Sequence, residues 1–115
     1  MGKPEGKIEK FLKAKAEENG FLCYKFIVPG KRGVPDRILM GHGHTFFVET
    51  KRETSGRLSE IQKARIKEMR AHGSTVYVCD SKDKVLNILA KYINKDISKN
   101  PSDNKSLSKT KKEDI

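Results

Sequence analysis

Apolar residues recur at two different spacings along this chain, and the spacing separates expected helices from expected strands. Near the start, four apolar residues recur at helical spacing among charged ones: Ile8, Phe11, Leu12 and Ala16. The stretch FLCYKFIV at 21–28 is instead rich in aromatic and branched residues, which is typical of a strand. Continued along the chain, these patterns predict helices at 4–19, 59–72 and 81–94 and strands at 21–28, 36–40, 45–51 and 75–80.

The order α-β-β-β-α-β-α predicts an α/β fold with a mixed central sheet flanked by helices. The sequence GHGH at 41–44 is a tight turn that would join two strands as a hairpin. We expect residues 1–95 to form one domain. Apolar residues almost disappear after that point, so 96–115 is expected to be a disordered, polar and basic tail.

The net charge of +10 and the pI of about 9.7 indicate what kind of partner this protein binds. Residues 95–115 hold six lysines against four acidic residues, so most of the positive charge belongs to the folded part. Such a surface attracts polyanions, with nucleic acid the expected partner and an anionic membrane the rival. Neither a signal peptide nor a spanning apolar run is apparent, which predicts a soluble, cytoplasmic protein of bacterial or phage type.

The strand TFFVETK at 45–51 carries the first candidate chemistry. Alternate residues of a strand share a face, so Glu49 and Lys51 would stand side by side. Phe46 and Val48 would point the other way and fill the core. An ordinary ion pair on a half-exposed strand would also account for the two charges.

A second carboxylate is expected beside this strand. In the sequence GVPD at 33–36, the proline favours extended backbone and places Asp36 at the start of a strand. If the hairpin pairs as expected, Asp36 lies near Glu49, and two adjacent carboxylates suit Mg²⁺ or Mn²⁺. A Pro-Asp turn without chemistry is the alternative.

The order of GVPD, ETK at 49–51 and LSEIQ at 58–62 resembles the virus-type replication–repair nuclease (VRR-NUC) domain of the PD-(D/E)xK superfamily. The resemblance runs from about residue 5 to 85. It implies a restriction-endonuclease-like core and Mg²⁺- or Mn²⁺-dependent hydrolysis of DNA phosphodiester bonds. Asp36, Glu49 and the Thr50 backbone carbonyl would hold the metal, and Lys51 would orient water or offset negative charge.

Three further polar residues are candidates for the same site. Gln62 fits a helix capping box with Ser59, yet it faces inward and the family places a glutamine at the active site, so both roles are open. Related nucleases complete the site with an acid of the first helix. Glu5 and Glu9 both suit that position, and either could instead be a surface charge near a helix N-terminus.

Other polar residues receive simpler interpretations. A phosphate-binding loop is expected around PGKRG, alternatively a solvated basic turn; its residues are Lys25, Gly30, Lys31, Arg32 and Gly33. The His42-x-His44 pair is explained by a hairpin tip. Cys23 and Cys79 lack metal-site spacing and are expected to be buried free thiols.

The family resemblance further implies a structure-selective endonuclease that acts on branched or four-way junction DNA in replication, repair or recombination. We expect a homodimer, because symmetric cutting needs two sites and because the third helix and its Tyr92-Ile93 end carry more apolar surface than one sheet face needs. The alternatives are a monomeric nicking or flap-trimming nuclease and a non-catalytic basic DNA-binding module. The intact set of Asp36, Glu49 and Lys51 argues against the module.

Overall fold

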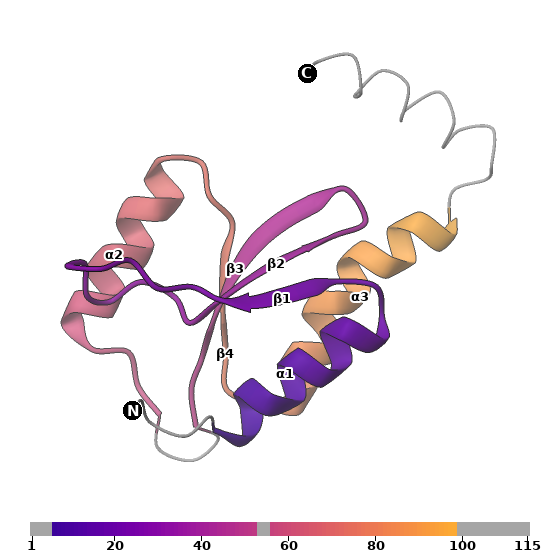
Figure 1. Ribbon diagram of the computed structural model, residues 1–115, viewed down its shortest axis with the longest axis horizontal. Coiled ribbons are helices and arrows are strands. Elements are labelled where there is room, and N and C mark those ends of the chain that lie inside the picture. Colours follow the sequence, from indigo (N-terminus) through magenta and orange to yellow (C-terminus); the bar gives the residue numbers. More distant parts are fainter. Residues whose placement is uncertain (1–5, 53–55, 99–115) are drawn as a thin grey trace.

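A four-stranded sheet with helices on both faces forms the centre of the molecule (Figure 1). The structure is a computed structural model and describes residues 6–52 and 56–98. The helices are α1 Lys7–Glu18, α2 Glu60–Ala71 and α3 Lys82–Ser98; the strands are β1 Leu22–Lys25, β2 Arg37–Gly41, β3 His44–Thr50 and β4 Val76–Cys79. This order confirms the predicted α-β-β-β-α-β-α sequence of elements and the α/β class.

Most element bounds differ from the sequence prediction by one residue, and the larger differences are at the start of α1, the end of β1 and the end of α3. The strand predicted at 21–28 is shorter and spans Leu22–Lys25, although the Phe26 N–H still donates to the Asp36 carbonyl just before β2. The last helix continues to Ser98, four residues past its predicted end, since neither glycine nor proline interrupts that stretch. The remainder of the predicted tail lies outside the described residues.

The sheet is mixed, as predicted, with strand order β1-β2-β3-β4. β1 pairs with β2 and β2 with β3 in antiparallel fashion, whereas β3 and β4 are parallel. A parallel pair needs a crossover connection, and α2 lies within it. This connection brings the start of α2 back to the end of β3, where the candidate residues lie.

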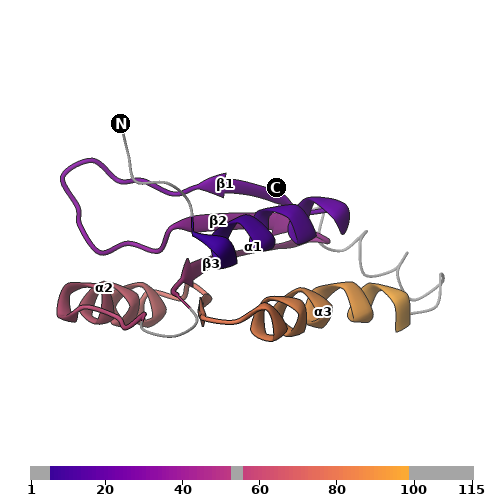
Figure 2. The same ribbon diagram turned by 90° about the horizontal axis from the view of Figure 1, so that it is seen from below.

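The main core lies between the sheet and the helices α1 and α3, which run side by side on one face (Figures 1 and 2). Its largest fully buried apolar side chains are Phe46, Leu12, Leu39, Leu89, Val48 and Val85. The helix α2 covers the other face beside β4, where Ile66 and Val76 are buried. The inward-facing residues of β3 are thus Phe46 and Val48, as expected from strand alternation.

The β2–β3 hairpin turns through two residues with positive φ, His42 at 54° and Gly43 at 83°, a combination typical of a type I′ turn. His42 Nε2 lies 2.8 Å from the carbonyl oxygen of Asn19, and the His44 ring lies 4.7 Å from that of Tyr92. Both histidines therefore have structural contacts, in agreement with the hairpin-tip interpretation.

Tyr92 and Ile93 are partly buried and pack against the core. The Tyr92 ring stacks on Phe46 at 4.5 Å, and its hydroxyl is hydrogen-bonded to that of Tyr77 at 2.6 Å. Ile93 also packs against the core cluster. These two residues are therefore partly buried against the core, whereas Leu86 on the same helix is 44% exposed, and the homodimer stays a prediction.

Cys23 and Cys79 are buried free thiols, as predicted. Burial raises the pKa of both, that of Cys79 to about 11, so neither is a reactive thiolate at neutral pH. No helix in the described part of the chain is both long enough and apolar enough to cross a membrane.

Candidate active site

Asp36 is held at the entrance of β2 by both neighbouring strands. The buried Pro35 precedes Asp36. The backbone carbonyl of Asp36 accepts a hydrogen bond of 2.8 Å from the Phe26 N–H. On the other side, the Thr50 N–H donates to Asp36 Oδ2 at 3.1 Å, and the Thr50 hydroxyl donates to the same oxygen. The Asp36 carboxylate therefore adds hydrogen bonds between β2 and β3 just beyond their last backbone pair, Arg37 and Val48.

Glu49 lies beside Asp36, as the hairpin register predicted. Arg37 pairs with Val48, which places Asp36 opposite Glu49 on the neighbouring strand. Glu49 is only 3% exposed. Burial raises the pKa of its carboxyl to about 8, and the hydrogen bond to Asp36 and that carboxylate's charge act in the same direction, opposed by Lys51. Glu49 therefore holds its proton to higher pH than an exposed glutamate does.

Gln62 connects the remaining members of the site. Its side-chain amide Nε2 donates to Glu49 Oε2 at 2.8 Å, and its Oε1 accepts a hydrogen bond from Lys51 Nζ at 3.1 Å. The Lys51 ammonium itself lies 3.5 Å from Glu49 Oε2. These contacts bring three groups together. They are the buried Glu49 carboxyl of β3, the Lys51 ammonium just after that strand, and the Gln62 amide at the start of α2.

The same glutamine also caps its helix. Gln62 Oε1 accepts a hydrogen bond from the Ser59 N–H at 2.9 Å, and the Gln62 N–H donates to Ser59 Oγ at 3.2 Å. This is a complete capping box. The structure therefore contains both sets of contacts that the sequence left open for Gln62, and the cap fixes the amide in the site.

The donor set suits a hard divalent cation. Asp36 and Glu49 lie opposite each other on neighbouring strands, and a cation held by both carboxylates would offset their mutual repulsion. In the described ranges, groups of three or more His, Cys, Asp or Glu side chains placed to hold a metal are absent. Two carboxylates are a donor set that Mg²⁺ accepts, since it binds one or two carboxylates and completes its shell with water and substrate phosphate.

Glu9 contacts a different group from the one expected. Its Oε2 accepts a hydrogen bond of 2.9 Å from Arg37 Nε and lies 3.5 Å from Lys25 Nζ. Arg37 is 2% exposed and also donates to the Cys23 carbonyl at 3.5 Å. Glu5, the other candidate of the first helix, lies outside the described residues, so the choice of acid stays a prediction.

Arg37 was not singled out from the sequence, although a signal was present. It alternates with Leu39 along β2 and so occupies an inward position, where a charged residue needs a buried partner. Glu9 is that partner across 28 residues of sequence. Lys25, predicted to contact DNA, joins this ion pair from the end of β1.

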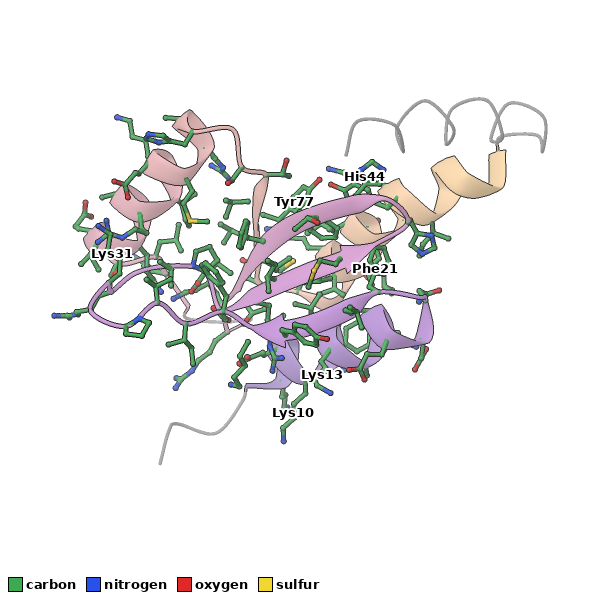
Figure 3. All side chains as sticks on the ribbon, turned by 45° about the horizontal axis from the view of Figure 1, so that its top comes forward. Lys10, Lys13, Phe21, Lys31, His44 and Tyr77 are labelled. Atoms are coloured by element: carbon green, nitrogen blue, oxygen red, sulfur yellow. The ribbon has the colours of Figure 1, made fainter. Side chains whose placement is uncertain are left out.

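The predicted phosphate-binding loop lies against α2. Arg65 Nε donates to the Arg32 carbonyl at 3.0 Å. Gly33 has φ +88°, and a Cβ there would come within 2.8 Å of the Ile61 carbonyl oxygen, so close packing against α2 requires this glycine. Gly30 has open space around it, and Lys31 is exposed on the same loop (Figure 3). Contact of this loop with DNA stays a prediction.

The comparisons with known proteins agree on one family. The profile of the VRR-NUC domain matches residues 24–83, more than half of the chain. "Putative nuclease p44" of Acyrthosiphon pisum secondary endosymbiont phage 1 is 38% identical over 80 residues, which cover 69% of this chain and 85% of that protein. A solved structure described as a VRR_NUC domain is 28% identical, with a TM-score of 0.70 over 76% of this chain and 96% of its own.

The matched region contains the whole carboxylate, lysine and glutamine cluster, namely Asp36, Glu49, Lys51 and Gln62. The fold agrees as well, since the similarity to the solved structure extends over most of both chains. Sequence, fold and site geometry therefore lead to one conclusion: the chain belongs to the VRR-NUC family and is a nuclease.

Proposed function

We propose that this nuclease is an Mg²⁺- or Mn²⁺-dependent endonuclease that hydrolyses DNA phosphodiester bonds. The observation that supports this most strongly is the placement of the Asp36 carboxyl opposite Glu49 on neighbouring strands, with Lys51 and Gln62 against Glu49. Like charges are brought so close only where a proton or a cation separates them. The high positive charge of the chain supports a polyanionic substrate.

Each residue has a separate task in this proposal. Asp36, Glu49 and the Thr50 carbonyl would hold the metal ion, which when bound neutralises phosphate charge and lowers the pKa of water. Lys51 orients the attacking water or offsets charge that develops on the phosphate oxygens. Gln62 keeps the Lys51 ammonium and the Glu49 carboxylate in register through its two hydrogen bonds.

We further propose branched or four-way junction DNA as the preferred substrate, acted on by a homodimer. The resemblance to the family supports the substrate, and symmetric incision supports two identical sites related by a two-fold axis. Large apolar side chains are exposed on and just after the edge strand β1: Leu22 at 51%, Tyr24 at 54% and Ile27 at 73%. This surface is a better candidate for the second copy than Tyr92 and Ile93.

A panel of labelled DNAs tests the proposal directly. The protein is incubated with duplex, splayed-arm, flap and four-way junction DNA, each with Mg²⁺, with Mn²⁺ and with EDTA. We expect paired incisions in the junction with either metal and none with EDTA. Preferred cutting of flaps by a monomer, as measured by light scattering, would instead favour the flap-trimming alternative. Tight binding of DNA without any cleavage would favour the non-catalytic module.

A further inference from the structure

Thr50, at the end of β3, directs two hydrogen-bond donors at one oxygen of Asp36. Its backbone N–H donates to Asp36 Oδ2 at 3.1 Å, and its side-chain hydroxyl donates to the same Oδ2. The sequence pattern predicted a role for this residue only through its backbone carbonyl. The hydroxyl is therefore an additional group of the site, placed on a carboxylate that the proposed mechanism uses.

The two donors restrict how the Asp36 carboxylate can turn. The terminal torsion of an aspartate is broad, so a carboxylate held only by its own backbone samples many orientations. Two donors on Oδ2 select one orientation and leave Oδ1 to face other partners. Hydrogen bonds of this kind to a ligating carboxylate fix its direction and tune its affinity for a metal.

Thr50 is itself rigidly placed, so it can act as a fixed reference for Asp36. It pairs with Cys79 in the parallel β3–β4 ladder, and the following Lys51 N–H donates to the Cys79 carbonyl at 2.8 Å. Cys79 is fully buried. A β-branched residue in a strand also has few rotamers, which favours a single position for the hydroxyl.

We infer that the Thr50 hydroxyl is a positioning group of the nuclease: it orients the Asp36 carboxylate so that Oδ1 is presented to the divalent cation. This inference rests on the proposed metal-dependent function. It predicts that the loss of one hydroxyl, without any change in the carboxylates, weakens metal binding.

Two substitutions separate the hydroxyl from the shape of the side chain. Thr50→Val keeps the branched shape, the backbone N–H and the carbonyl but removes the donor, whereas Thr50→Ser keeps the donor and removes the methyl. Thr45→Val is the matched control, because Thr45 is exposed on the same strand and away from the site. Binding of Mn²⁺ is measured by calorimetry without DNA, and thermal unfolding is measured in EDTA.

We expect Thr50→Val to weaken Mn²⁺ binding by about tenfold or more, with Thr50→Ser and Thr45→Val close to wild type. Cleavage by Thr50→Val should recover most of its maximal rate at high Mn²⁺, because the defect lies in metal occupancy. A purely structural role would instead lower the melting temperature in EDTA and leave the affinity unchanged.

Several results would overturn the inference, and they are distinguishable from failure of the proposed function. If wild type and Thr45→Val bind no Mn²⁺, the metal-dependent function itself is wrong, and the inference with it. If wild type binds Mn²⁺ and Thr50→Val binds it equally well, only the positioning role is wrong. A loss in Thr50→Ser without a loss in Thr50→Val would assign the effect to packing of the methyl group and reject the inference. Equal losses in both variants would show that retaining the hydroxyl does not restore binding, and would also reject it.

Discussion

Gln62 Nε2 donates a 2.8 Å hydrogen bond to Glu49 Oε2, and this single contact joins the N-terminus of α2 to the buried acid of β3. Because Gln62 also closes the capping box with Ser59, helix capping and site geometry depend on the same side chain. The two roles can be separated by mutation.

Ser59→Ala and Gln62→Ala form a matched pair for that separation. Ser59→Ala removes the side-chain cap, which should lower stability by about 1 kcal/mol, while its backbone N–H and the contacts of Gln62 with Lys51 and Glu49 remain. Gln62→Ala should lose similar stability and also lose most cleavage activity. Chemical unfolding and junction cleavage are the measurements; equal activity of the two variants would restrict Gln62 to capping.

The carboxylates and the lysine should be individually required for cleavage. Asp36→Asn, Glu49→Gln and Lys51→Ala are each expected to reduce the cleavage rate by at least about 100-fold, because each removes charge where the reaction develops it. DNA binding in EDTA should persist, since it depends on the whole basic surface. Lys10→Ala, an exposed cation on α1, is the charge control (Figure 3). Wild-type cleavage by Asp36→Asn in Mg²⁺ would reject its role as a ligand.

The stability of the metal-free protein should fall as pH rises. The pKa of Glu49 is raised from 4.5 to about 8, so the folded state binds this proton more tightly than the unfolded state. The resulting stabilisation is complete below the unfolded pKa and disappears as pH rises through about 8. Melting temperatures in EDTA between about pH 5 and about pH 9 should therefore decline.

Glu49→Gln provides the internal test of that pH dependence, because it cannot lose a proton. Its melting temperature should change with pH less than that of wild type, and the exposed Glu18→Gln should behave as wild type. Parallel slopes for all three proteins would show that Glu49 is not the titrating group. Metal binding near neutral pH should also release a proton, which calorimetry in two buffers can count.

Glu9→Gln should destabilise the protein more than it impairs the metal site. The substitution removes a charge partner of Arg37, which is 2% exposed, and the stability loss should reach about 3 kcal/mol. Glu17→Gln on the same helix breaks an exposed pair with Lys13 and should lose under about 1 kcal/mol. Wild-type Mn²⁺ affinity in folded Glu9→Gln would remove Glu9 as a ligand and favour Glu5.

The sequence by itself determined the order of elements and the meeting of Asp36 with Glu49. Both follow from local rules, because strand alternation selects the faces and a two-residue turn sets the register of the hairpin. The short spacing from GVPD to ETK leaves little freedom for the two carboxylates to lie apart. Strand alternation alone likewise assigns Glu49 and Phe46 to opposite faces of β3.

Only the tertiary structure decided how distant elements complete and support the site. The capping box could be predicted from the sequence. The hydrogen bonds of Gln62 with Lys51 and Glu49 depend instead on where the crossover connection places α2. The partnership of Glu9 with Arg37 depends on how α1 packs on the sheet. Such contacts arise from the packing of faces that are compatible with several partners, so residue spacing alone does not specify them.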